Sequence, residues 1–169
     1  MAKLVSKTYG DALFEVAVES GQLDAYWEET KSVSAAMEEN PKLFKLMSHP
    51  KIVKEEKVKI IEDIFAGKVS GELVGLLRMI VEKDHFDEIT DVLEYFDGRV
   101  KECKNIGTAY VTTAMELSDA QKEAVEKRLL ETTKYVKFEM HYAVDSAIIG
   151  GMIIRIGDRV VDSSVRTKL

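Results

Sequence analysis

Two adjacent glycines in the stretch AIIGGMIIRIGDRVVDSS (147–164) are the first residues that could do chemistry. Adjacent glycines can form a loop whose backbone N–H groups bind phosphate, but such a loop opens a helix and is usually followed by Lys and Ser or Thr. Here Met152, Ile153 and Ile154 follow, so the chain is expected to continue as a strand. Glycine inside a strand usually marks a bulge or a close approach of two backbones. We therefore predict a structural role for Gly150 and Gly151.

Histidines and carboxylates could also act as metal ligands or as acid and base catalysts. His49, His85 and His141 lie in three different predicted elements, and none has a second ligand at helical or hairpin spacing. The adjacent glutamates at 28–29, 38–39 and 55–56 lie on predicted helices. Neighbours on a helix point about 100° apart, so these pairs do not converge on one reacting atom. The sequence predicts no metal site and no acid–base pair.

The single cysteine, Cys103, excludes an internal disulfide and a thiolate-based metal site. It continues the apolar stripe of a predicted helix, so we expect a buried structural thiol. No catalytic nucleophile motif occurs, and we expect neither an enzyme nor a cofactor.

Composition narrows the class of partner. The 169 residues carry a formal net charge of −6, all of it in residues 1–105, which hold 15 basic and 21 acidic side chains. Without a basic stripe, nucleic acid and anionic lipid are poor partners, so we expect protein partners. No apolar run is long enough to span a bilayer, and the N-terminal stretch lacks the pattern of a signal peptide. Together with the lone cysteine, these features favour a reducing, cytoplasmic compartment.

Hydrophobic periodicity divides the chain into two halves. Up to about residue 105 the period is near 3.6, which predicts six short helices, with Ser70 capping the fifth. After residues 105–107 the pattern alternates, with strands expected near 108–117, 135–144 and 147–156 and a short "RVVD" after a turn at 157–158. A capping box of Ser118 and Gln121 predicts a helix between the first two strands. The fold class is therefore α+β, with an N-terminal six-helix bundle (1–105), a small C-terminal β-α-β-β domain (106–169) and a hinge near 105–107.

The first and fifth helices have apolar arcs wider than the stripe of about 100° that a helix at the edge of a bundle needs. Two explanations stay open from the pattern alone. Both helices are central in the bundle, or they form a groove that an amphipathic helix from a partner completes. The acidic surplus would favour a partner helix that carries some positive charge.

Three stretches carry a resemblance that runs essentially end to end. They are TYGDALFEVAVE (8–19), LLRMIVEKDHFDEITDVLEYF (76–96) and, most specific of all, VDSAIIGGMIIRIGDRVVDSSVRTKL (144–169). With these, the chain resembles the delta subunit family of the F-type ATP synthase, called oligomycin-sensitivity-conferring protein in mitochondria.

The resemblance implies a non-catalytic stator subunit of the peripheral stalk in the proton-translocating enzyme. Its helical domain would bind the N-terminal helix of an alpha subunit, and its C-terminal domain would bind the ends of the b subunits. Rotor torque would then be coupled to ATP synthesis. The implied location is the cytoplasmic face of the bacterial cell membrane, peripheral and without insertion, with one copy per complex and no cofactor.

The resemblance also carries two sets of residues onto this sequence. The residues implied to bind the alpha-subunit helix are Tyr9, Ala12, Leu13, Val16, Leu76, Met79 and Ile80. The signature residues of the stalk-docking domain are Asp145, Gly150, Gly151, Arg155, Gly157, Asp158, Ser164, Val165 and Arg166. The segment after residue 157 is implied to turn toward a final helix that faces the stalk. The contact with the stalk would be weaker if the chain ended early at Leu169. The alternative function is a free-standing helical adaptor for amphipathic peptides.

Overall fold

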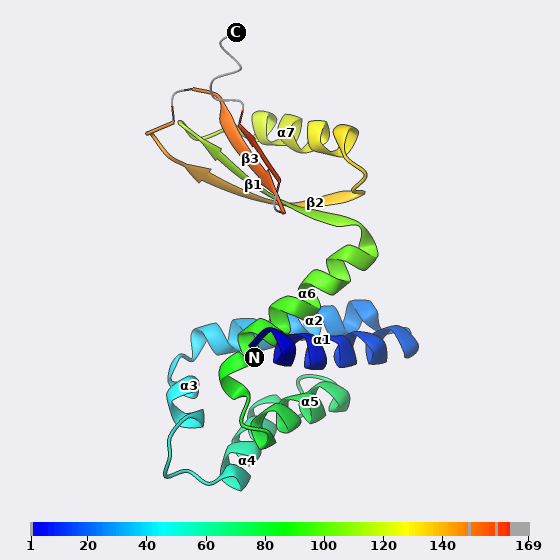
Figure 1. The fold of residues 1–169 in the computed structure, drawn as a ribbon, viewed down its shortest axis with the longest axis vertical. Coiled ribbons are helices and arrows are strands. Elements are labelled where there is room, and N and C mark those ends of the chain that lie inside the picture. Colours follow the sequence, from blue (N-terminus) through cyan, green and yellow to red (C-terminus); the bar gives the residue numbers. More distant parts are fainter. Residues whose placement is uncertain (1, 149, 158, 163–169) are drawn as a thin grey trace. The chain divides into compact units, whose positions relative to one another are not determined.

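The computed structural model describes residues 2–148, 150–157 and 159–162, and it divides the chain into two compact units. The units are Met1–Val100 and Lys101–Leu169, which we call the helical unit and the C-terminal unit (Figure 1). The division falls inside the last helix of the bundle. The predicted α+β fold class, with a helical bundle before a small mixed unit, is confirmed.

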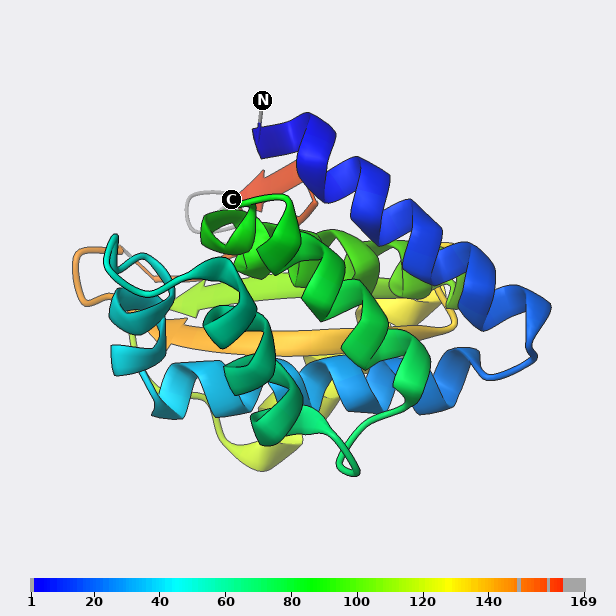
Figure 2. The same cartoon turned by 90° about the horizontal axis from the view of Figure 1, so that it is seen from below.

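The helical unit is built from short helices joined by tight connections. Its elements are α1 (Ala2–Glu19), α2 (Leu23–Glu39), α3 (Lys42–Met47), α4 (Lys54–Phe65), α5 (Gly71–Glu82), the 3-10 turn η1 (Phe86–Glu88) and α6 (Ile89–Lys104), which continues past the division. Figures 1 and 2 both show α1 and α2 running antiparallel.

One apolar core joins the helices of this unit. The largest side chains that are fully buried include Tyr26 of α2, Ile61 of α4, Leu73 and Leu77 of α5, and Phe96 of α6. Each comes from the apolar stripe of its helix, which is the pattern that the 3.6-residue period predicts. Burial of these faces fixes which residues of each helix are left for solvent or for partners.

Capping side chains set two helix starts, as the sequence predicts. The Ser70 hydroxyl accepts a hydrogen bond from the backbone N–H of Leu73 and starts α5. Ser118 and Gln121 form the reciprocal capping box of α7. Both caps satisfy N–H groups that the first helical turn otherwise leaves unpaired.

The C-terminal unit is a four-stranded mixed sheet with one helix. Its elements are β1 (Ile106–Thr113), α7 (Asp119–Thr132), β2 (Lys137–Val144), β3 (Met152–Ile156) and β4 (Arg159–Asp162), with strand order β2-β1-β3-β4. β1 and β2 are parallel, which requires the α7 crossover, whereas β3 is antiparallel to both β1 and β4.

The helix α7 packs on one face of this sheet. Ala109, Leu129 and Phe138 form the buried centre, with Ile154 and Ile156 packed around it. Strand side chains alternate between faces, so the opposite face carries the other residues of each strand. α7 does not cover that face within the described residues.

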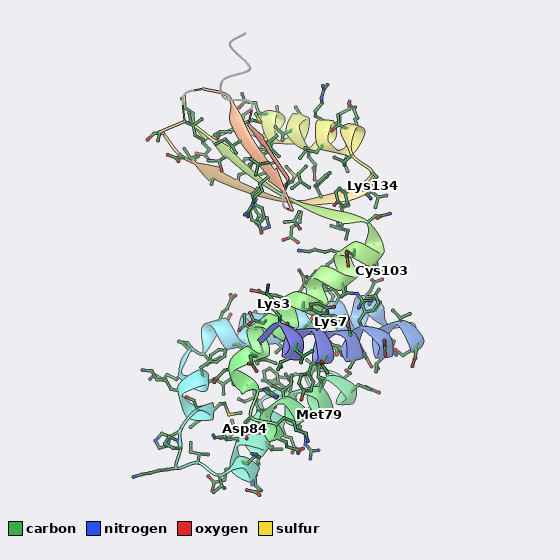
Figure 3. The ribbon with its side chains drawn as sticks, viewed as in Figure 1. Lys3, Lys7, Met79, Asp84, Cys103 and Lys134 are labelled. Atoms are coloured by element: carbon green, nitrogen blue, oxygen red, sulfur yellow. The ribbon has the colours of Figure 1, made fainter. Side chains whose placement is uncertain are left out.

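Two sequence predictions are wrong in detail. Gly150 and Gly151 do not interrupt a strand, because β3 begins at Met152 and both glycines precede it with positive φ angles of 66° and 65°. They therefore form a turn in left-handed conformations that L side chains rarely adopt, so the expected bulge is absent. Cys103 is exposed (Figure 3), because the buried stripe of α6 ends at Val100.

Candidate docking surfaces

Exposed and half-buried apolar residues lie on α1 and α5, two helices that are in contact with each other. On α1, Tyr9, Ala12 and Val16 follow one another at spacings of three and four, and on α5 Leu76 and Met79 are three apart. Such spacings place each set on one side of its helix. We call these five residues the α1/α5 surface.

The exposure of these side chains is uneven. Met79, labelled in Figure 3, is 49% exposed and Val16 is 39% exposed, while Tyr9 and Leu76 are half-buried. Leu13 and Ile80, which the sequence groups with them, are only 3% and 0% exposed and belong to the core. The structure therefore separates the predicted set into residues that a partner can touch and two that support them from beneath.

A polar cluster holds α1 against α6. The Asp11 carboxylate accepts hydrogen bonds from the Tyr95 hydroxyl at 2.9 Å and from Lys7 at 3.1 Å, and it is ion-paired with Arg99. Burial of Asp11 alone would raise its pKa, but the hydrogen bonds from Tyr95, Lys7 and Arg99 outweigh burial and leave the pKa below its ordinary value. The Arg99 guanidinium also lies 4.2 Å from the centre of the Phe14 ring.

Exposed acidic side chains lie on the same two helices as the α1/α5 surface. They are Glu15 and Glu19 on α1 and Glu72 and Glu82 on α5, where Arg78 pairs with Glu82 and Lys83 follows the helix. An apolar strip on helices that carry these carboxylates is complementary to an amphipathic helix that carries Lys or Arg beside its apolar face.

The face of the sheet away from α7 carries a stack of three side chains. Tyr110 of β1 stacks on His141 of β2, with ring centres 4.8 Å apart, and the Arg155 guanidinium of β3 lies 4.4 Å from the centre of the Tyr110 ring. Val160 of β4 pairs with Arg155 in the register and is exposed. These residues, Tyr110, His141, Arg155 and Val160, are named the open sheet face.

A charged cluster borders that face. Glu139 binds Lys101 at 2.7 Å and His141 at 2.8 Å. Burial would raise the pKa of Glu139, but the bonds from Lys101 and His141 dominate and lower it. Arg155, by contrast, has no carboxylate partner among the residues that the structure describes.

The signature residues of the C-terminal stretch divide into three groups. Arg155 points to the open sheet face through its contact with Tyr110. Asp145 directly follows β2, where its carboxylate accepts the N–H of Ala147, and the turn glycines Gly150, Gly151 and Gly157 all have positive φ. Asp158, Ser164, Val165 and Arg166 lie outside the described residues.

The sequence argument missed the stack on the open sheet face. Alternation along the strand puts His141 on the opposite face from Phe138 and Met140, but nothing in one sequence aligns His141 with Tyr110 or Arg155. That alignment depends on the register, in which Tyr110 pairs with His141 and with Arg155.

Groups that could do chemistry stay dispersed. Across the described residues, no three His, Cys, Asp or Glu side chains are arranged to hold a metal ion. His85 pairs with Glu88 at 3.0 Å and His141 with Glu139, whereas the Nδ1 atom of His49 accepts a backbone N–H. In the same part of the chain, no helix has the length and apolar character to cross a membrane.

Comparison with known proteins decides the family. The profile described as ATP synthase delta (OSCP) subunit matches residues 5–169. The chain belongs to the ATP synthase delta (OSCP) family. It is thus a non-catalytic component of the peripheral stalk of an F-type ATP synthase, and the resemblance seen in the sequence is confirmed.

Individual relatives of this delta-family chain agree over nearly its whole length. The ATP synthase subunit delta of Lachnoclostridium phytofermentans is 56% identical over 169 residues, which cover 100% of this chain and 93% of the relative. That of Desulforamulus reducens is 33% identical over 165 residues, covering 98% and 91%. A chain in a cryo-EM structure of the Toxoplasma gondii mitochondrial ATP synthase hexamer has the same fold, with a TM-score of 0.77, 19% identity and coverage of 96% and 92%.

Proposed function

We propose that the helical unit binds the N-terminal helix of an alpha subunit through the α1/α5 surface. One observation carries the proposal: Ala12, Val16 and Met79 are exposed apolar or small residues on two contacting helices whose other sides are buried. A partner helix laid along them would cover an apolar strip that water otherwise contacts.

The residues that the resemblance implies for this site differ in their proposed roles. Ala12, Val16 and Met79 touch the partner, and Tyr9 and Leu76 form the half-buried base of the site. Leu13 and Ile80 act from the core by fixing the positions of α1 and α5. Glu15, Glu19, Glu72 and Glu82 favour basic residues along the edges of the bound helix.

The C-terminal unit is proposed to bind the ends of the b subunits. Its open sheet face offers apolar contact at Tyr110 and Val160, beside an Arg155 guanidinium that can bind a carboxylate. One copy of the chain would then join the catalytic head to the stalk and hold the head against rotor torque. The proposed location is the cytoplasmic face of a bacterial cell membrane, peripheral and held by the complex.

Calorimetric titration with a synthetic peptide of the alpha-subunit N-terminal helix tests the first contact. We expect saturable one-to-one binding that is lost with Ala12→Asp, because the carboxylate would be buried beneath the peptide. Ala124→Asp, an exposed helical alanine of α7, is the matched control and should bind as the unchanged protein does. Calorimetry is preferred to Trp27 fluorescence, because Trp27 is not one of the α1/α5 surface residues and its indole N–H is bonded to Asp97 of α6.

Absence of binding by a well-folded sample would contradict the assignment of the α1/α5 surface. Equal weakening by Ala12→Asp and Ala124→Asp would also contradict it, because a general effect of added negative charge would then explain both.

A further inference from the structure

An apolar groove lies on the helical unit between α2, α3 and α4. Leu43 and Phe65 are buried at its base, while Leu46 and Ile64 are partly exposed along its sides. Its volume is about 630 Å3, within the range of cavities that hold ligands. None of the residues of the α1/α5 surface lines it.

Cationic side chains form the rim of this α2/α3/α4 groove. Lys42 and Lys45 are exposed and line it together with His49, and no Asp or Glu is among the lining residues. Across the described residues, neither lysine has a carboxylate within ion-pair distance. A basic rim is notable because residues 1–105 carry an excess of acidic side chains.

His49 adds a further donor. Its Nδ1 atom accepts the backbone N–H of Lys51 at 3.1 Å. A neutral imidazole whose Nδ1 accepts carries its proton on Nε2, so that N–H is left to donate. Two ammonium groups and one imidazole N–H therefore border one apolar depression.

Packing contacts on the inner side of α3 position it beside the groove. Phe44 packs against Phe86 of η1 with ring centres 5.3 Å apart, while Leu43 and Met47 are buried. These contacts hold α3 from its inner side and leave Lys42, Lys45 and Leu46 facing outward. A fixed site avoids the ordering cost that weakens binding to mobile segments.

We propose that the α2/α3/α4 groove docks an amphipathic helix of a protein partner, with aliphatic residues on its apolar face and carboxylates along its edges. The apolar face would cover Leu46 and Ile64, and the carboxylates would pair with Lys42, Lys45 and the His49 N–H. This goes beyond the proposed function, because the α1/α5 surface has an acidic border and would select a basic helix. Because the borders of the two sites carry opposite charge, each site can select a different partner helix.

The test uses the full chain and two synthetic amphipathic peptides. Both have leucines repeating at spacings of three and four, and the flanking positions carry Glu in one peptide and Lys in its twin. We expect the Glu peptide to shift the backbone amide resonances of Leu43, Leu46 and Ile64 in NMR titrations. The Lys42→Glu, Lys45→Glu double variant should weaken its affinity by about tenfold, because two favourable charge contacts become repulsive.

A matched charge control is Lys3→Glu with Lys59→Glu, two exposed lysines that do not line the groove, which should retain the affinity of the unchanged chain. Several outcomes would overturn the proposal. They are no binding of the Glu peptide, equal binding of both peptides, or resonance shifts confined to α1 and α5. Saturable binding of dodecanoate at these residues without binding of the Glu peptide would instead indicate a small-amphiphile site.

Discussion

At the scale of single residues, Gly10 fixes how closely α1 can approach α6. A Cβ atom at this buried position would overlap the ring of Tyr95. The ring has little freedom to withdraw, because its hydroxyl is bonded to Asp11 at 2.9 Å. The close contact with Tyr95, and not the backbone conformation, therefore requires glycine at position 10.

We expect Gly10→Ala to lower the free energy of unfolding of the helical unit by about 1–3 kcal/mol, as overpacking does elsewhere. Urea unfolding followed by Trp27 fluorescence measures it, since the one tryptophan lies in this unit. Gly75→Ala on α5 is the control: its added Cβ meets no atom within 4 Å, so it should stabilise the helix by up to about 1 kcal/mol. Equal effects from both variants would refute the steric argument.

Asp11 makes the stability of the helical unit depend on pH. Its pKa is lower in the folded state than in the unfolded chain, because hydrogen bonds from Tyr95, Lys7 and Arg99 outweigh burial. The contribution of the Asp11 carboxylate to the free energy of unfolding is therefore complete above its unfolded pKa of about 4. It is lost as the pH falls through the folded-state pKa of Asp11.

Asp11→Asn should reduce stability by about 1–2 kcal/mol at pH 7. The loss should be smaller below the unfolded pKa of about 4, because the unfolded chain then takes up the proton at Asp11 more readily than the folded chain does. Unfolding curves above and below this pKa give the comparison. Asp63→Asn on α4 is the matched control, because it removes one exposed carboxylate that has no ion-pair partner among the described residues. A pH profile of Asp11→Asn parallel to that of the unchanged chain would show that Asp11 is not the titrating group.

At the scale of elements, the cap of α5 links local sequence to the proposed docking function. Ser70 accepts the N–H of Leu73 at 3.3 Å, and α5 supplies Leu76 and Met79 to the α1/α5 surface. Loss of the cap would fray the turn that precedes these residues.

We expect Ser70→Ala to cost about 1 kcal/mol of stability in urea unfolding. Ser32→Ala makes the same chemical change inside α2, where the exposed hydroxyl bonds the Glu28 carbonyl of its own helix. Alanine has the higher helix propensity, so Ser32→Ala should be neutral or slightly stabilising. If Ser70→Ala is equally harmless, the cap does not define the start of α5.

Local signals explain what could be predicted from the sequence. The helix caps formed by Ser70, Ser118 and Gln121 act within one helical turn. Their hydrogen-bond partners are three residues away in the chain, so the sequence alone predicts these caps. Cys103 was predicted wrongly because the apolar stripe of α6 continues in spacing but not in burial after Val100. The stack of Tyr110, His141 and Arg155 depends on strand register across three strands, which periodicity within one strand does not determine.

At the scale of the whole molecule, a stator subunit works as a link in series. Torque passes only if the head contact and the stalk contact hold at the same time. In the proposed assignment, Met79 belongs to the first contact and Arg155 to the second, and they lie in different compact units. Breaking either contact should therefore be as harmful as breaking both.

Inverted membranes carrying Met79→Asp, Arg155→Glu or both variants test this arrangement. Each single variant should lower ATP-driven proton pumping severalfold and release more ATPase activity on washing, because the head is no longer held. The double variant should add little to the worse single variant, since effects of parts that act as one unit are not additive. Additive losses would instead mean that the two surfaces support coupling independently, and the series arrangement proposed for this chain would then be wrong.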